Sequence, residues 1–422
     1  MNTTVSGLAD DMSISGQDAV QCWYSYSPYP NVQIYDEALS IVNGAYYEGW
    51  LSRTGLGNPM PAMQGFAIRT YAGAPYTIDL TGAPHSGSQS IDITNTASAT
   101  PGQDGWNFIG NPFASPISWT NTNANNPGAT TGAYYVFNTT GEYTGNWGSY
   151  NGVTGTNGAD DFIGTMQGFF VKAVGPLNYV EANSASRVAS PYIPFFKTYA
   201  VQPSEIRLSL HDATNSDEIV AYTDGAATWS EDMGHDAVKI PAGSTVYMSY
   251  KQLGKEYAIN VIDEITETTE LPLILWAQDT GSYTFEATEL NVDGYITYLK
   301  DAEMNTLTDL TTTASIQLPL NGGQTYEGRY SIVFEAVEIP SGIANINEGK
   351  TKIYSHRNIA VVERNNDQPA TITITNTLGQ TIKEVTTDSK RTEILLDNAN
   401  PWYAIVKVKE ANATQTGKLL IK

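Results

Sequence analysis

Histidines and paired carboxylates are the residues of this chain that could do chemistry, and their spacing supports none. The four histidines lie far apart, at His85, His211, His235 and His356. Two of them directly precede an aspartate, but neighbouring residues on a strand point to opposite faces, so neither pair predicts a catalytic triad. No HExxH segment, Gly-x-Ser-x-Gly elbow, Walker loop or dinucleotide-binding fingerprint stands in a suitable context. The sequence therefore predicts no catalytic residue and no enzyme.

Acidic neighbours raise the question of glycoside hydrolysis, which needs two carboxylates at a defined separation. In a chain with 44 acidic residues such neighbours arise by chance, and two carboxylates identify nothing without geometry. Solvated loops are therefore the default interpretation of Asp160/Asp161, Glu231/Asp232 and Asp263/Glu264.

One oxygen-rich turn is a better candidate for a metal. It contains Asp212, Asn215, Asp217 and Glu218, side chains that a calcium ion prefers, although the spacing is not that of an EF-hand. Hydrogen bonds within the turn explain the same residues without a metal. We therefore expect no cofactor, with Ca²⁺ as the alternative.

Aromatic side chains near the loop-rich region suggest a surface for stacking sugars. The candidates are Trp119, Tyr143, Trp147 and Tyr150. Exposed coplanar rings would bind glycans, whereas most Tyr and Trp residues of β-sandwiches belong to the core or to cross-strand pairs. Surface glycans are therefore possible partners of an adhesin module.

Composition limits the class of protein. The 422 residues are too many for one ordinary domain, and their hydrophobic fraction of 41% is enough for packed cores. The net charge of −22 argues against a nucleic-acid partner, because phosphate binding needs a basic stripe. The single cysteine, Cys22, excludes a disulfide within one chain and is expected to be a small buried hydrophobe.

The charge is unevenly spread. Residues 1–341 contain 11 basic and 36 acidic residues, a net charge of −25, whereas residues 342–422 contain 11 and 8, a net charge of +3. Half of the basic residues thus lie in the last fifth of the chain, which indicates a different partner for that segment. No apolar run reaches membrane-spanning length, and the segment after Met1 resembles no signal peptide, so we expect Met1 to begin a fragment or a mature form.

Short alternating segments separated by Gly, Asn, Asp and Pro predict an all-β fold of several sandwiches. In the first part, Met63-Gln64-Gly65-Phe66 recurs as Met166-Gln167-Gly168-Phe169, and Gly57-Asn58-Pro59 is echoed by Gly110-Asn111-Pro112. The echo predicts two related strands, or two halves of a larger sandwich, each strand opened by a turn glycine, with the Arg69 and Lys172 ends in solvent. Residues 120–132 and 138–160 are rich in Asn, Thr and Gly and are interpreted as long surface loops.

Domain boundaries follow from composition. A loop-rich β-sandwich module or pair of modules is predicted for residues 1–196, ending in the proline-containing crossing at Ser190–Phe196. A second β-sandwich is predicted for residues 197–340, where strands recur from Ile206 to Phe334. Pro340-Ser341-Gly342 is the expected linker to a third domain, residues 341–422.

The third domain is predicted to be a small immunoglobulin-like sandwich. Its expected strands lie at 351–354, 359–362, 370–374, 381–383, 393–396, 404–408 and 417–422. Seven short strands in about eighty residues fit that fold. Residues Asn376–Gln380 supply a hairpin turn, in which Gly379 takes positive φ.

This ordered set of segments resembles the C-terminal sorting domain of proteins that Bacteroidota export by type IX secretion. The resemblance covers about a fifth of the chain, and it departs from the family at Pro401-Trp402 and at Ala404, where the family has an inward Tyr. It implies a sorting signal recognised by the outer-membrane translocon and shuttle proteins, and cleavage by a sortase-like protease. The implied signal residues are Asn376, Gly379, Gln380, Lys407, Gly417, Lys418, Leu419, Leu420, Ile421 and Lys422.

The sequence therefore predicts a non-catalytic protein that crosses the outer membrane and is secreted or held at the cell surface. Two alternatives stay open, a glycan-binding adhesin module and a structural subunit of a surface layer or fibre. An open sandwich edge presents unpaired backbone groups, so capture by strand addition is the expected route of recognition. Normal surface delivery after deletion of Gly417–Lys422 would rule that route out.

Overall fold

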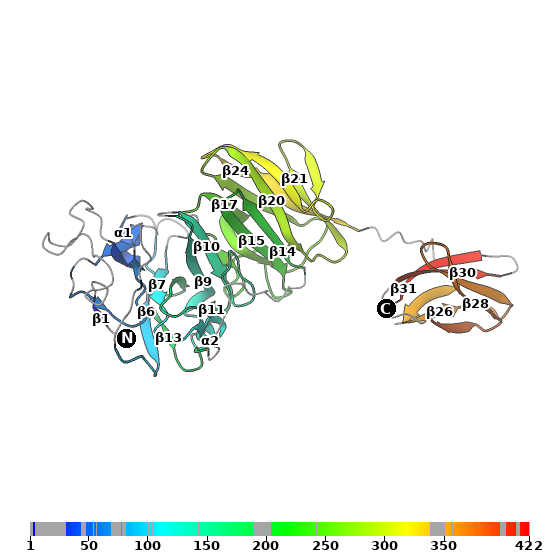
Figure 1. Ribbon diagram of the computed structural model, residues 1–422, viewed down its shortest axis with the longest axis horizontal. Coiled ribbons are helices and arrows are strands. Elements are labelled where there is room, and N and C mark those ends of the chain that lie inside the picture. Colours follow the sequence, from blue (N-terminus) through cyan, green and yellow to red (C-terminus); the bar gives the residue numbers. More distant parts are fainter. Residues whose placement is uncertain are drawn as a thin grey trace. The chain divides into compact units, whose positions relative to one another are not determined.

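The computed structural model describes residues 3–4, 31–43, 48–53, 55, 57–68, 77, 82–98, 102, 104–141, 144–188, 204–240, 243–337, 351–356, 358–396, 402–410 and 414–421. The regular secondary structure of these residues is almost entirely β, which confirms the predicted fold class. They fall into two compact units, Met1–Val337 and Glu338–Lys422 (Figure 1). Among them, no helix has the length and apolar content needed to cross a membrane.

Small sheets and two short helices make up the start of the first unit. Two two-residue strands pair there, β1 (Thr3–Thr4) and β4 (Pro59–Met60). A three-stranded sheet contains β2 (Val32–Tyr35), β3 (Trp50–Ser52) and β5 (Ala67–Ile68), and β6 (Gln89–Ile93) pairs with β13 (Asn178–Ala182). Helix α1 (Glu37–Asn43) is held by Glu37, whose buried carboxylate accepts hydrogen bonds from the backbone of Thr96 and Gly105. Helix α2 (Trp119–Ala124) is capped by the hydroxyl of Ser118.

A four-stranded antiparallel sheet is the centre of this part. Its order is β10-β9-β12-β7, with bounds Gly145–Tyr150, Thr130–Thr139, Gly168–Ala173 and Trp106–Gly110. Two short strands, β8 (Ile117–Ser118) and β11 (Phe162–Ile163), pair beside it. The two copies of the Met-Gln-Gly-Phe segment, residues 63–66 and 166–169, flank the same strand, β7. Gly65 N–H donates to the Phe108 carbonyl, and Gly168 is the register partner of Gly110.

A continuous eleven-stranded sheet forms the rest of the first unit and wraps around its own core (Figure 1). Its order is β22-β21-β24-β19-β17-β18-β15-β14-β20-β23, and β16 pairs with β18. The bounds in chain order are β14 (Ile206–His211), β15 (Ser216–Thr223), β16 (Ala237–Val238), β17 (Val246–Gln252), β18 (Lys255–Ile262), β19 (Glu270–Ala277), β20 (Gly281–Leu290), β21 (Tyr295–Asp301), β22 (Thr306–Asp309), β23 (Ser315–Leu320) and β24 (Thr325–Ala336). Leu208, Leu273 and Phe285 are among its fully buried side chains.

One apolar cluster joins the four-stranded and eleven-stranded sheets. Trp106, Tyr135 and Phe170 come from the first, and Tyr222 and Val261 come from the second. Because these side chains share one core, the segments expected as separate modules, 1–196 and 197–340, contribute to a single compact unit. Residues 190–196, expected to cross between those modules, lie outside the described residues.

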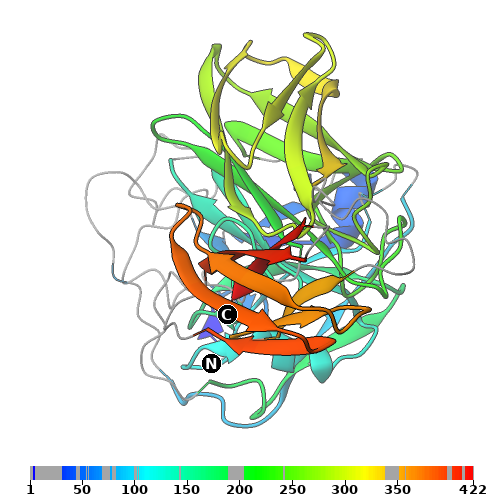
Figure 2. The same ribbon diagram turned by 90° about the vertical axis from the view of Figure 1, so that its right-hand side faces the viewer.

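The second unit is a two-sheet sandwich, drawn in orange to red (Figures 1 and 2). One sheet has the order β25-β26-β29, and the other has the order β28-β27-β30-β31. Bounds are β25 (Lys352–His356), β26 (Ile359–Glu363), β27 (Ala370–Thr375), β28 (Thr381–Thr387), β29 (Arg391–Leu395), β30 (Trp402–Lys409) and β31 (Thr414–Ile421). All seven strands expected from the sequence form, and Ile372, Ile394 and Val406 lie in the core between the sheets.

Two expectations for the first unit are wrong. Residues 120–132 and 138–160 are not long surface loops, because they contain β10, most of α2 and both ends of β9, and because Thr154 and Thr156 are fully buried. Polar side chains can be buried when their hydrogen bonds are satisfied, which composition does not reveal. Lys172 does not end in solvent either: it is buried, its ammonium group lies 5.7 Å from the Trp106 ring centre, and burial lowers its pKa.

Candidate functional site

The hairpin between β27 and β28 contains three of the expected signal residues. The side-chain oxygen of Asn376 accepts hydrogen bonds from the backbone of Leu378 and Gln380, at 3.0 Å each. Its amide donates to the Gln380 side chain at 2.7 Å, and Gly379 has a φ of 81°. These residues therefore build the turn, and the turn presents the apolar side chain of Leu378, which is 83% exposed, to solvent.

Strands β30 and β31 divide the other signal residues between two faces. Leu419 and Ile421 are buried in the sandwich core, opposite Ala404 and Trp402. Lys418 and Leu420 point the other way and are exposed. Ala404 is fully buried, so this chain has a small inward residue where the resembling family has Tyr.

The outer face of the four-stranded sheet of the second unit is exposed, so a partner can reach it. Lys407 lies there opposite Thr416, and Lys409 lies opposite Thr414. Lys418 contacts the exposed ring of Tyr403, with the ammonium group 4.2 Å from the ring centre. The face thus combines three lysines, a tyrosine and rows of threonine hydroxyls.

The last strand lies at the edge of its sheet. Among the described strands β31 pairs only with β30, and the hydroxyl of Ser355 on β25 donates to the Leu420 carbonyl at 2.8 Å. A Cβ atom on Gly417 would lie 3.1 Å from the Ile353 side chain, so glycine allows β25 to pack close to β31. Lys422, the remaining signal residue, lies outside the described residues.

The oxygen-rich turn does not form one site. The Asp212 carboxylate accepts backbone hydrogen bonds from Thr214 and Asn215, which lower its pKa against the opposing effect of burial. Asp217 and Glu218 follow on β15, where neighbouring side chains point to opposite faces. Among the described residues, no three His, Cys, Asp or Glu side chains are grouped as metal ligands would be.

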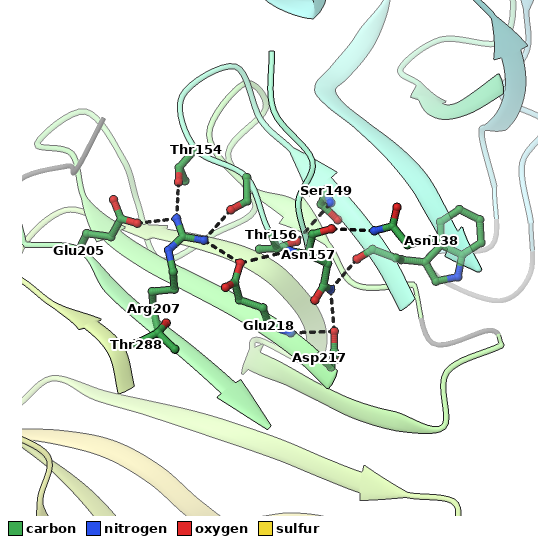
Figure 3. Close-up of polar contacts among 12 residues, drawn as sticks. Asn138, Ser149, Thr154, Thr156, Asn157, Glu205, Arg207, Asp217, Glu218 and Thr288 are labelled. Carbon is green, nitrogen blue, oxygen red and sulfur yellow. Dashed lines mark hydrogen bonds and ion pairs between the residues drawn. The ribbon is translucent and has the colours of Figure 1, made fainter. Parts of the chain in front are cut away.

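Asp217 and Glu218 instead belong to a buried polar network between the 151–158 loop and β14 and β15 (Figure 3). Asp217 accepts hydrogen bonds from the Lys239 ammonium group at 2.6 Å, the Asn157 amide at 2.8 Å and Met248 N–H at 2.8 Å. Both Lys239 and Asp217 side chains are almost fully buried. The carboxylate therefore has protein partners on both oxygens and no free position for a ligand.

Arg207 is the centre of the same network (Figure 3). One terminal nitrogen donates to the Glu218 carboxylate and to the Gly155 carbonyl, both at 2.7 Å. The other donates to the Glu205 carboxylate at 2.7 Å and to the Thr154 hydroxyl at 2.9 Å. Burial raises the pKa of Glu218 despite the neighbouring guanidinium. The arrangement is that of a structural ion cluster, since each group is enclosed by protein partners.

Two of the histidines, His211 and His235, each lie near a single carboxylate. His211 Nε2 lies 3.6 Å from Glu286, and His235 Nδ1 lies 3.7 Å from Asp224. Among the described contacts of these two rings, none is to a hydroxyl or thiol that could act as the nucleophile of a triad. Asp236, next to His235, is buried, and desolvation raises its pKa to about 6.

The proposed aromatic platform is largely core. Trp119 and Tyr150 are buried, and the Trp119 indole donates to the Gly132 carbonyl at 2.8 Å. Trp147 packs against Phe137 and Phe170, with ring centres 5.1 and 5.6 Å apart. Tyr143 lies outside the described residues, as does Cys22. Trp119, Trp147 and Tyr150 therefore offer no exposed coplanar surface for a sugar.

A cleft of about 430 Å³ lies where the two copies of the repeated segment meet. The sequence did not predict this cleft, although the two copies of the repeated segment form part of its walls. Phe108 of β7 lies between the copies, and a Cβ atom on Gly65 or on Gly168 would come within 2.6 Å of its ring. The lining residues are Met60, Pro61, Ala62, Met63, Gln64, Gly65, Phe66, Ile68, Pro84, Gly110, Asn111, Pro112, Phe113, Ala114, Thr165, Met166 and Gly168.

Equivalent methionines of the two copies have the same unusual backbone. Met63 has a φ of 63°, and Met166 has a φ of 59°. Non-glycine residues rarely adopt this left-handed conformation, which brings Cβ close to the following carbonyl. The sequence echo is therefore a structural repeat of one turn, placed on both sides of β7.

Comparison with known proteins identifies a family but no activity. A family model described as "Domain of unknown function (DUF8693)" matches residues 5–334. No curated protein matches the sequence. A solved chain described as "Biofilm associated protein - BSP domain" is 11% identical with a TM-score of 0.15, over 34% of this chain and 28% of that one. At that TM-score the likeness carries no argument about function.

Proposed function

The chain belongs to the family described as a domain of unknown function (DUF8693), and we propose that this domain is the non-catalytic body of an exported surface protein. In this proposal residues 341–422 act as the sorting signal of type IX secretion, as in the Bacteroidota proteins that they resemble. The observation that carries it is the separate compactness of the second unit, which has its own seven strands and core beyond the family match. The translocon and shuttle proteins would bind this unit, and a sortase-like protease would release it outside the outer membrane.

Recognition of a folded signal must use exposed groups. Leu419 and Ile421 are buried, so they stabilise the sandwich and are not available to a partner. Lys407, Lys418 and Leu420 share the outer face of the four-stranded sheet and are available. The signal is therefore proposed to be this face together with the Leu378 turn, rather than the terminal residues as a linear tag.

Fusion of residues 338–422 to a periplasmic reporter tests the delivery role. The fusion is expected outside the outer membrane of a Bacteroidota strain with type IX secretion, and in the periplasm of the same strain without the translocon. Equal delivery in both strains would contradict the proposal. Mass spectrometry of the surface protein is expected to show loss of residues 341–422, whereas an intact domain on every mature molecule would favour a structural role.

Charge reversal on one face tests where recognition occurs. Lys407→Glu with Lys418→Glu is expected to reduce export, because both side chains lie on the outer face of the four-stranded sheet. Lys352→Glu with Lys390→Glu makes the same change in charge at exposed positions outside that sheet, and it serves as the control. Deletion of Gly417–Lys422 is a poorer test, since it also removes two core side chains.

A structural subunit of a surface layer or fibre is the second candidate function. It is favoured by the edge position of β31, which pairs only with β30 among the described strands. An edge strand can add a strand from a neighbouring molecule, here at the backbone groups that the Ser355 hydroxyl does not occupy. Ordered polymer in electron micrographs of the purified chain would support this candidate, and a stable monomer at high concentration would exclude it.

A further inference from the structure

Met166 at the rim of the 430 Å³ cleft combines two unfavourable properties. Its backbone is left-handed, with a φ of 59°, and its apolar side chain is 53% exposed. Met63, at the equivalent position of the other copy, is 3% exposed, so core packing explains its presence. No such packing compensates at Met166, and glycine would adopt the same backbone without strain. Strained residues of this kind cluster at ligand sites.

The walls of the cleft indicate what kind of molecule it takes. None of its described lining residues carries a charge, in a chain that has 66 charged residues. Of its three polar side chains, Asn111 is engaged within the protein, because its amide donates to the carbonyls of Ser115 and Gly164 at 2.9 Å each. Besides the side chains of Gln64 and Thr165, what remains for contact is thioether, proline ring and phenyl surface, which attracts apolar groups and adapts to their shape.

We propose that this cleft is a binding site for a small uncharged apolar molecule, and that Met166 closes over it from the rim. The cleft volume lies within the range of ligand sites in proteins. Met60 and Met63 line the inner wall and Met166 the outer one, so bound ligand contacts thioether groups on both sides. The exposed side chain of Met166 becomes buried when the site is filled.

Methyl NMR of the full chain locates such binding. The protein is labelled with ¹³C at its eight methionine methyl groups and titrated with the uncharged fluorescent probe N-phenyl-1-naphthylamine. The methyl signals of Met60, Met63 and Met166 are expected to shift together with one dissociation constant. Those of Met233 and Met304, which are exposed elsewhere on the first unit, are expected to stay in place. Shifts at those two, or none at the first three, would overturn the proposal.

Substitution at Met166 separates a ligand contact from a structural role. Met166→Gly is expected to weaken probe binding about tenfold, the loss of roughly two methylene contacts, while Tm stays the same or rises because strain is relieved. Met304→Gly, at a methionine that is 64% exposed, is the matched control and is expected to leave the probe affinity unchanged. If Met166→Gly binds the probe with unchanged affinity, whether or not its Tm is lowered, the Met166 side chain serves only the fold.

Discussion

Replacing Arg207 with methionine tests whether its ion cluster holds the first unit together. The substitution keeps an apolar stem of similar length but removes four hydrogen bonds of 2.7–2.9 Å. It takes the cation away from Glu205, whose side chain is fully buried, and from the largely buried Glu218. Breaking a buried ion pair by removing one partner costs about 3–5 kcal/mol. We expect the free energy of unfolding to fall by about that amount.

Chemical denaturation followed by tryptophan fluorescence measures the change at pH 7.5. Lys300→Met, which breaks the exposed ion pair with Glu270, is the control and is expected to cost at most about 1 kcal/mol. Adding Glu205→Gln to Arg207→Met is expected to restore part of the loss, because it removes a buried charge that has lost its cation. A loss below about 1 kcal/mol for Arg207→Met would refute the reasoning. A further loss on adding Glu205→Gln would refute it as well.

The pH dependence of Arg207→Met gives a second, independent readout. Burial raises the pKa of the Glu218 carboxyl above its value in the unfolded chain, and removal of the guanidinium raises it further. A carboxyl with a raised pKa binds its proton more tightly in the folded state, so folding gains stability below that pKa and loses it as the pH rises through it. The deficit of the variant is therefore expected to be smaller at pH 5 than at pH 8.

Three further predictions concern other parts of the fold. Burial raises the pKa of Asp236 to about 6, so the stability that the protonated carboxyl contributes is lost as the pH rises through 6. The difference in free energy of unfolding between the protein and Asp236→Asn is therefore expected to change by up to roughly 3 kcal/mol over pH 4–7. A difference that stays constant over that range, measured from denaturation midpoints, would contradict this. Gly65→Ala places a methyl group 2.6 Å from the Phe108 ring and 2.9 Å from the Phe108 backbone, so the free energy of unfolding is expected to fall by about 1–3 kcal/mol. Thermal unfolding measures this change, and an unchanged Tm would show that the strand shifts freely. Gly379→Ala forces a residue with a side chain into a φ of 81° and is expected to destabilise the second unit by about 1–2 kcal/mol. Calorimetry of the full chain should show a lower unfolding temperature for that unit alone. A lower unfolding temperature of the first unit would count against the prediction.

The strands of the second unit were predictable because strands such as β27 and β30 alternate between buried and less buried residues and because the turns have local signals. Gly379 and the Asn376 amide define one hairpin by local chemistry alone. Ile372 and Val406 are buried and alternate with less buried neighbours, as expected for strands with one buried face. Local patterns of this kind survive folding unchanged, which is why all seven strands appear where they were expected.

The first unit was harder to predict because long-range pairing overrides its composition. Asn157 lies in a Gly- and Asn-rich segment that looks like loop, yet its amide joins the Trp147 carbonyl to the Asp217 carboxylate at 2.8 Å each. Lys172 ends a strand that looks amphipathic, but Trp106 on the neighbouring strand covers it. Hydrogen-bond partners sixty residues away leave no trace in local periodicity.

The two candidate sites differ in the same way. The face around Lys407 and Lys418 follows from strand alternation once the register is known, so a resemblance found in sequence could point to it. The cleft forms where two turns about a hundred residues apart in the sequence lie on either side of β7. In the sequence, the shared Met-Gln-Gly-Phe segment was the one indication that the two turns are related. The methionine of this turn has a left-handed backbone in both copies, but it is exposed in one copy and buried in the other. Core packing explains the buried methionine, and the proposed ligand contact at the rim of the cleft would explain the exposed one.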